Sequence, residues 1–214
     1  MLPSPVSLVV AGGGPAGFLA AVTAAEADPR RSVLLLEATP EPLHKVLISG
    51  GGRCNVTHAC WEPRTLIGNY PRGGKALLSP FSRFAPAEAI AWFAARGLEL
   101  VQEDDGRLFP RSQRSSSVVD CLRRSAVAAG VMLRTGAALH SAEPLASGGF
   151  QLRLRSGEEL RTDRLVLATG SHPSGHRLAR SLGHSLVAPV PSLFTLRLEN
   201  TALGDLAGVT VDPV

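Results

Sequence analysis

Three glycines near the start of the chain stand at a spacing that suits one kind of chemistry. Gly12, Gly14 and Gly17 follow the apolar run Leu8–Ala11 in the pattern G-x-G-x-x-G, and a helical pattern begins directly afterwards. Without side chains, these positions permit a tight turn, a close approach of the backbone to a pyrophosphate, and a helix that lies close to the strand. The helix N-terminus then offers free N–H groups and a positive dipole end to the phosphates.

An acidic residue further along extends this pattern. Residues 32–37 have the composition of a second buried strand, and Glu37 at its end is placed to accept hydrogen bonds from ribose hydroxyls. The small apolar residues of 16–27 predict the helix between the two strands. The stretch therefore predicts a dinucleotide-binding βαβ unit, and a doubly wound sheet without a dinucleotide is the alternative.

A second glycine cluster offers another anion-binding backbone. Gly50–Gly52 lies between Ser49 and Arg53, and Asn55 follows closely. Three successive glycines leave a bare backbone whose N–H groups can form a concavity for an anion. The planar guanidinium of Arg53 suits phosphate, and the amide of Asn55 can donate and accept. The alternative is a flexible glycine loop between elements.

The elements that must position these turns follow from periodicity and from turn residues. Helices are predicted at 16–27, 75–83, 86–96 and 115–129. Strands are predicted at 8–11, 32–37, 98–102, 131–135, 150–155, 159–164 and 165–168. The alternation of apolar strands with helices predicts an α/β fold with a parallel sheet, and the two stretches after 150 predict a small antiparallel meander.

The composition is that of an ordinary globular protein. Of the 214 residues, 44% are hydrophobic and 19% are charged. The net charge of +4 and the pI of about 9.5 describe a mildly basic surface, because the arginines are spread along the chain. Three cysteines make no disulfide framework, and no apolar run approaches the ~20 residues of a membrane span. We therefore expect a cytoplasmic location.

Two motifs together resemble a known family. Gly-Gly-Gly-Pro-Ala-Gly at 12–17 and Ile-Ser-Gly-Gly-Gly-Arg-Cys-Asn-Val-Thr at 48–57 are similar to the BaiN-like flavoproteins. These are also described as NAD(P)/FAD-dependent oxidoreductases or as the aminoacetone oxidase family. The resemblance continues through 82–84, 106–110, 168–170 and 181–184, so it covers nearly the whole chain.

The resemblance implies a Rossmann-like FAD/NAD(P)-binding domain of the glutathione-reductase type. The implied cofactor is FAD, with NAD(P)H as a candidate reductant. The first glycine turn would hold the pyrophosphate, Glu37 the adenosine ribose, and residues 51–55 the flavin side. The residues implied to contact the cofactor are Gly12, Gly14, Pro15, Ala16, Gly17, Glu37, Ala38, Lys45, Gly51, Gly52, Arg53, Cys54, Asn55, Leu139, Ala168, Thr169 and Gly170.

The resemblance also divides the chain into two parts. Residues 1–188 would form the FAD-binding domain, and residues 189–214 the truncated start of an inserted second domain. In the family the chain later returns to complete the flavin site, so we expect this chain to be the N-terminal half of a longer protein. The expected partners are that missing C-terminal half and a small organic substrate, without a membrane and with nucleic acid less favoured.

Two cysteines and two histidines offer further chemistry. A flavin disulfide reductase carries a redox pair after a similar glycine turn, but five residues separate Cys54 from Cys60 where such enzymes have four. This spacing favours a structural role for Cys54. His172 and His176 are four residues apart, yet the proline and glycine between them argue against one helical face. We therefore predict no metal site.

These observations leave two classes of function. The first is a flavin oxidoreductase, in which FAD carries the chemistry and the protein positions it. The second is a non-catalytic flavin- or nucleotide-binding module, and a flavoprotein that acts on RNA is a subsidiary version supported only by the pI. No histidine, glutamate or tyrosine is assigned as a catalytic acid or base. The acidic run 103–105 predicts a solvated turn.

Overall fold

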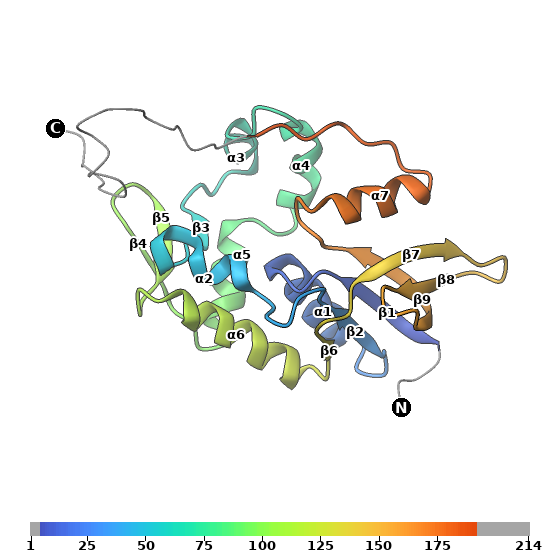
Figure 1. Cartoon of the computed structure of the whole chain (residues 1–214). Coiled ribbons are helices and arrows are strands. Elements are labelled where there is room, and N and C mark those ends of the chain that lie inside the picture. The colour runs from blue at the N-terminus through green and yellow to red at the C-terminus, as the bar shows by residue number, and fades with distance from the viewer. Residues whose placement is uncertain (1–4, 192–214) are drawn as a thin grey trace, which may run out of the picture. The chain divides into compact units, whose positions relative to one another are not determined.

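The computed structural model describes residues 5–191, and residues 1–4 and 192–214 lie outside the described part (Figure 1). The chain divides into two compact units, Met1–His184 and Ser185–Val214. All helices and strands described below belong to the first unit. Of the predicted second domain, 189–214, only 189–191 are described, so that boundary stays a prediction.

A six-stranded sheet forms the centre of the first unit, in the order β6–β2–β1–β9–β8–β7. The strands β1 (Val6–Ala11), β2 (Val33–Leu36), β6 (Met132–Arg134) and β9 (Glu159–Leu167) are parallel to one another. Every residue of β2 and all but one of β1 are buried. Strands covered on both faces need continuous apolar runs, which is why these two segments contain almost no polar residues.

The antiparallel strands belong to the same sheet. The strands β7 (Leu139–Pro144) and β8 (Phe150–Leu154) extend it beyond β9. The first residues of β9 pair antiparallel with β8, and its later residues pair parallel with β1, with Thr162 in both registers. The prediction of two separate strands in this region was therefore wrong, because one strand of nine residues serves both neighbours.

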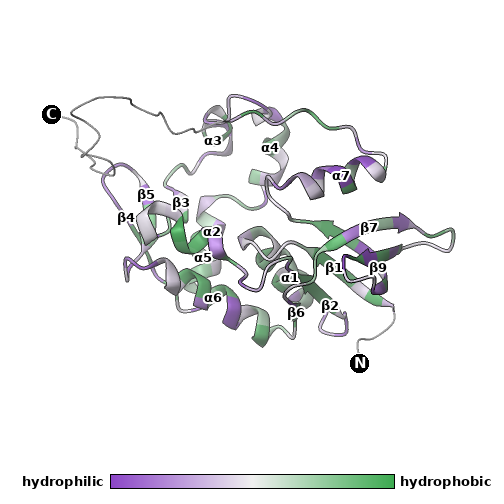
Figure 2. Ribbon diagram, in the orientation of Figure 1, coloured by the Kyte–Doolittle hydropathy of each residue, from purple (hydrophilic) through white to green (hydrophobic). Residues whose placement is uncertain are grey.

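Helices cover both faces of the parallel strands. Figure 1 shows α1 (Pro15–Ala27) and α6 (Ser115–Ala128) on one side and α7 (Pro173–Ser181) on the other. Alternate residues of β1 and β2 point to opposite faces, so one core contains Val10 and the other contains Val9. Figure 2 shows the apolar residues concentrated on these central strands. The α/β fold with a mostly parallel sheet is confirmed.

Among residues 5–184, a small antiparallel sheet and five short helical segments are the remaining elements. The strands of this sheet, in the order β3–β5–β4, are β3 (Thr57–His58), β5 (Arg107–Pro110) and β4 (Leu100–Gln102). The helical segments are α2 (His44–Ile48), the 3₁₀ turn η1 (Ser49–Gly52), α3 (Pro63–Gly68), α4 (Gly74–Phe81) and α5 (Pro86–Ala94).

The start of a helix separates the two histidines. The α7 helix begins at Pro173 and includes Gly175 and His176, whereas His172 lies outside it with an extended backbone. Proline fits this position because the first helical N–H needs no partner within the helix. His172 is the N-cap, and its Nδ1 accepts the Ser174 N–H at 3.2 Å. Among residues 5–191, no cluster of three side chains suited to a metal ion is found.

Candidate cofactor-binding site

The first glycine turn contains two glycines that the fold itself requires. A Cβ on Gly17 would overlap the carbonyl oxygen of Gly12 and contact the Leu35 side chain. A Cβ on Gly12 would overlap the carbonyl of Ala168, and its φ of +120° is also unfavourable for other residues. The close packing of α1 on β1, and of β1 on the end of β9, therefore explains both glycines without a ligand.

Gly14 is different, because the protein leaves space around it. A Cβ on Gly14 would meet no atom within 4 Å, and its φ of −82° is accessible to any residue. Gly14 is also the N-cap of α1, where no side chain accepts the free N–H groups. Pro15 and Ala16 in the first turn are exposed. A bare helix N-terminus in front of open space has the donor geometry of an anion site.

Glu37 fixes the turn from the neighbouring strand. Its Oε2 accepts the Gly13 N–H at 2.7 Å, and its Oε1 accepts both the N–H and the hydroxyl of Thr39 at 2.8 Å. These bonds aim the carboxylate at the glycine turn. A carboxylate has about four acceptor positions, so capacity for a hydroxyl of a ligand is left beside the turn. Ala38 follows and is exposed.

The end of β9 forms another wall of the same site. The Ala168 N–H donates to the Ala11 carbonyl at 2.8 Å, which places residues 168–170 beside Gly12. Thr169 packs against the first turn of α7, because a Cβ on Gly175 would overlap its hydroxyl oxygen. The carboxyl ends of β2, β1 and β9 therefore bring together the first turn, Glu37 and residues 168–170. Ligands of open α/β sheets bind at such strand ends.

The second glycine turn is tied to the first by the segment before α2. The Leu43 N–H donates to the Gly13 carbonyl at 2.9 Å, and Leu43 is buried with a left-handed φ of +64°. The α2 helix then leads directly into η1, and its Lys45 is exposed. No signal in the sequence predicts this left-handed leucine, because its conformation follows from the contact with the distant turn.

All three glycines of the second turn have a left-handed backbone. The φ values of Gly50, Gly51 and Gly52 are +55°, +63° and +84°. The turn is closed at its base by the Cys54 N–H, which donates to the Ser49 carbonyl at 3.0 Å. A Cβ on Gly51 or Gly52 would meet no atom within 4 Å, so these two face open space. Asn55 next to them is exposed.

Arg53 does not extend freely from this turn. Its Nη1 donates to the carboxylate of Glu103 at 2.6 Å and to the side-chain oxygen of Gln113 at 3.1 Å. Its guanidinium also lies 4.0 Å from the ring centre of Phe109. The sequence predicted Arg53 as a ligand-facing donor, whereas its side chain is held by three partners from the small sheet and the segment after it.

Glu103, Phe109 and Gln113 are the residues near this turn that sequence reasoning missed. Glu103 was predicted to lie in a solvated turn, but its carboxylate bonds Arg53 and lies 3.5 Å from Arg107. The contacts of Arg53 with these residues join positions 50 or more residues apart. The only available signal was the closeness of 103 to the motif at 106–110, to which no role was attached.

Cys54 sits where the second turn enters the small sheet. It is buried with a φ of +63°, and burial raises the pKa of its thiol, with a smaller opposing effect from a hydrogen bond to Ser49. A raised pKa keeps the sulfur protonated and unreactive at neutral pH. Cys54, Cys60 and Cys121 are all free thiols.

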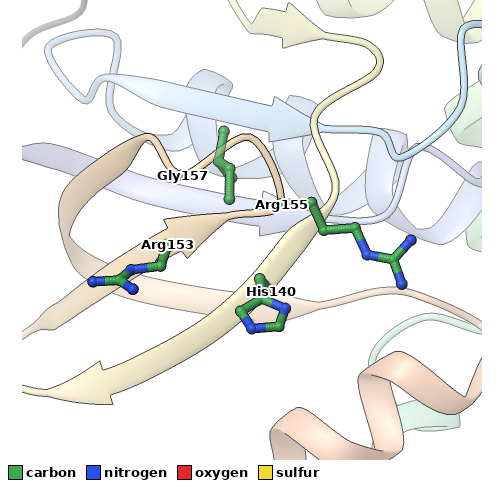
Figure 3. A pocket seen from close by; sticks show the side chains of 5 residues that line it. His140, Arg153, Arg155 and Gly157 are labelled. Atoms are coloured by element: carbon green, nitrogen blue, oxygen red, sulfur yellow. The ribbon is translucent and has the colours of Figure 1, made fainter.

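Two further places involve the strands β7 and β8. Leu139 begins β7 and packs against the core on the α7 side of the sheet. An open pocket of about 430 Å³ lies nearby, lined by His140, Arg153, Leu154, Arg155 and Gly157. Figure 3 shows its two arginines pointing in opposite directions, and Arg153 donates to Glu159 at 2.8 Å. The arginines therefore form no convergent site for one ligand.

The fold and these strand-end turns define a Rossmann-type α/β domain. The family model described as HI0933-like protein Rossmann domain matches residues 6–213. The chain therefore belongs to the HI0933-like family of FAD-binding Rossmann domains. In residues 5–191, none of the helices is long and apolar enough to cross a membrane.

Several curated relatives are similar over nearly the whole chain. The 3-dehydro-bile acid delta(4,6)-reductase of Clostridium scindens is 32% identical over 95% of this chain and 50% of its own length. The ribosomal RNA dihydrouridine synthase of Escherichia coli is 28% identical over 96% of this chain and 52% of its own length. The chain thus spans about half the length of the curated relatives it matches.

Solved structures share the fold at low identity. THI4 of Thermovibrio ammonificans superposes with a TM-score of 0.58 at 13% identity, covering 85% of this chain and 64% of its own. A 3-ketosteroid-delta4-(5alpha)-dehydrogenase of Rhodococcus jostii superposes with a TM-score of 0.56 at 18% identity, covering 80% of this chain and 47% of its own. At these identities the likeness concerns the fold alone.

Proposed function

We propose that this chain supplies the FAD-binding part of a flavin-dependent oxidoreductase. The observation that carries the proposal is the open space around Gly14. Nothing in the fold requires glycine there, in contrast to Gly12 and Gly17, so its lack of a side chain is explained by a group that must approach the backbone. The bare N-terminus of α1 fits the negative charge of a pyrophosphate.

The proposed roles divide the site into an ADP part and a flavin part. The first glycine turn and the α1 N-terminus bind the pyrophosphate, and Glu37 accepts hydrogen bonds from the adenosine ribose. Residues 51–55, Lys45 and residues 168–170 line the flavin side, and the chain near Leu139 lies towards the adenine. FAD, when bound, supplies the hydride or electron transfer, while these residues bind it, orient it and exclude water.

The substrate class follows from what the names of the relatives have in common. One name describes reduction of delta(4,6) double bonds in a 3-oxo compound, and the other describes conversion of uridine to dihydrouridine. Both reactions saturate a carbon–carbon double bond conjugated to a carbonyl group. We propose that the whole protein reduces such a bond, with NAD(P)H as electron donor and a free small molecule as substrate.

RNA is a second candidate substrate, supported by the ribosomal RNA dihydrouridine synthase among the relatives and by the net charge of +4. The small molecule is preferred because the bile acid reductase is the more similar protein, at 32% identity. The use of Cys54 and Cys60 as a redox pair is not favoured, since burial holds the Cys54 thiol in its protonated form. The cytoplasmic location is also a proposal and rests on the cysteine count.

A titration with FAD tests the proposal. We expect saturable binding to the 214-residue chain, with ADP competing for the same site. Prolonged anaerobic incubation with FAD, NADPH and a 3-oxo-4,6-diene steroid should then give some product that has gained two hydrogens, detected by mass spectrometry. Absence of FAD binding at millimolar concentration would remove the proposed function. Reduction of uridine in RNA, with binding that falls steeply with salt, would favour the second candidate.

A further inference from the structure

The second glycine turn rests on a side chain from the small sheet. Phe109 of β5 is fully buried, and a Cβ on Gly50 would lie only 3.3 Å from its ring and 2.9 Å from the Asn55 N–H. The chain leaving the turn then bonds β5, because the Val56 N–H donates to the Leu108 carbonyl at 2.8 Å. The position of β5 therefore determines the position of the turn.

Arg53 also contacts both Phe109 and the glycine turn. Its guanidinium stacks on Phe109, and its own N–H donates to the Gly50 carbonyl at 3.2 Å. The turn is therefore held between its backbone bonds and a cation stacked on the aromatic ring. A carboxylate that hydrogen-bonds this guanidinium fixes its orientation over the ring.

That carboxylate belongs to Glu103 at the end of the β4–β5 hairpin. Glu103 accepts from Arg53 at 2.6 Å and lies 3.5 Å from Arg107, whose guanidinium is 5.4 Å from the same ring. Its side chain is 31% exposed, so the pair is partly shielded from water. Glu103 thus links the turn to the hairpin, because its carboxylate pairs with Arg53 of the turn and with Arg107 of the hairpin.

We propose that Glu103 is a positioning residue that holds Arg53 on Phe109 and so fixes the second glycine turn for the flavin. The inference rests on the proposed function, because the turn matters only if the cofactor lies against it. Glu103 touches neither the cofactor nor the substrate in this proposal. It acts by holding the backbone of Gly51 and Gly52, which faces open space, in a fixed position.

The Glu99–Arg111 pair provides a matched control. It also joins two strand ends of the small sheet through a short ion pair, but both side chains are more exposed, at 62% and 67%, and neither touches the turn. The variants are therefore Glu103→Ala and Glu99→Ala, with Glu103→Gln as a conservative form that keeps an acceptor for Arg53. Each removes one negative charge from the same sheet.

Amide hydrogen exchange measures the turn without any cofactor. We expect Glu103→Ala to raise the exchange rates of the Arg53 and Cys54 amides about fivefold, the upper range for a partly exposed ion pair. Glu99→Ala should leave these amides unchanged, and Glu103→Gln should lie between. Equal rates in Glu103→Ala and the wild type would overturn the proposal.

Visible circular dichroism of bound FAD tests the consequence for the flavin. At saturating FAD, Glu103→Ala should lose about half of the induced signal or more, because the ring is less fixed, while ADP affinity and thermal stability stay close to those of Glu99→Ala. An unchanged flavin signal would overturn the positioning role. If the wild type itself binds no FAD, the proposed function and the flavin half of this inference fail together, while the exchange rates still decide whether Glu103 holds the turn.

Discussion

A side chain at Gly14 would enter open space, whereas one at Gly17 would overlap the protein backbone. Substitutions at these two glycines therefore test the proposed site. Gly14→Val places its side chain in open space in front of α1, so we expect the free energy of unfolding to change by no more than about 1 kcal/mol. The same side chain occupies the space proposed for the pyrophosphate. Affinity for ADP should fall at least about tenfold, measured by calorimetry.

Gly17→Ala is the control, because its Cβ would overlap the backbone of Gly12. It should lower the free energy of unfolding by about 1–3 kcal/mol, as overpacking does in well-packed cores. Unchanged ADP binding by a folded Gly14→Val protein would contradict the assignment of the first turn.

Because two thiols are buried, we expect the free energy of unfolding to fall at alkaline pH. Burial raises the pKa of Cys54 and of Cys121 above 9.0, so the folded chain keeps protons that the unfolded chain releases. Stability from this source is fully present below pH 9 and falls as the pH rises through the pKa of the folded state. Urea denaturation at pH 8 and pH 10 measures the difference. A Cys54→Ala variant should lose less stability between these pH values than the wild type, and an equal loss would contradict the prediction.

The sequence predicted the structural roles of some site residues and not of others. Gly12 and Gly17 were predicted from local requirements of a turn and a helix, and such requirements are visible in the spacing. The direction of the Arg53 side chain was not predicted, because it depends on Glu103 in a hairpin 50 residues away. The left-handed backbone of Leu43 likewise follows from a contact with the first turn, which no local pattern records.

The elements with strong periodicity were predicted within a few residues, and the weak ones were missed. The helix α6 at Ser115–Ala128 and the strand β6 at Met132–Arg134 match their predicted ranges closely. The α2 helix has only five residues, too few for a helical period to be recognised. The strand β7, at 139–144, has polar and half-buried residues because it forms the edge of the sheet.

The contact between α7 and the end of β9 gives a prediction at the scale of elements. A Cβ on Gly175 would overlap the hydroxyl of Thr169, so Gly175→Ala should push α7 away from the turn at 168–170. We expect a loss of about 1–3 kcal/mol in unfolding free energy. The loss should be largely relieved in the double variant Thr169→Ala with Gly175→Ala, which removes the overlapping hydroxyl. A double-mutant cycle with no coupling between the two positions would show that α7 is held elsewhere.

The whole chain spans about half of its curated relatives, and this leads to a prediction about ligand affinity. The ADP part of the proposed site lies within the described residues, whereas the resemblance assigns another wall of the flavin part to the C-terminal half. We therefore expect the chain alone to bind ADP and FAD with similar, weak affinity and to turn over slowly. Calorimetric titration with each ligand measures this directly.

A complete flavin site would give a different result. If FAD bound about a hundredfold more tightly than ADP, a difference of about 2.7 kcal/mol, the ring would have its full set of contacts within these 214 residues. A longer protein that carries the C-terminal half implied by the resemblance should bind FAD more tightly, with ADP affinity nearly unchanged. Equal effects on both ligands would argue against the division into an ADP part and a flavin part.

The central position of β1 in the sheet also affects how the chain folds. β1 pairs with β2 soon after it is made, but its other neighbour, β9, is about 150 positions away, with Val6 opposite Thr162. During synthesis from the N-terminus, one side of β1 keeps unpaired N–H and carbonyl groups until almost the whole domain has emerged from the ribosome. Such an open apolar edge is prone to pair with other chains, so we expect the domain to be most open to misassembly in the period before β9 has been made.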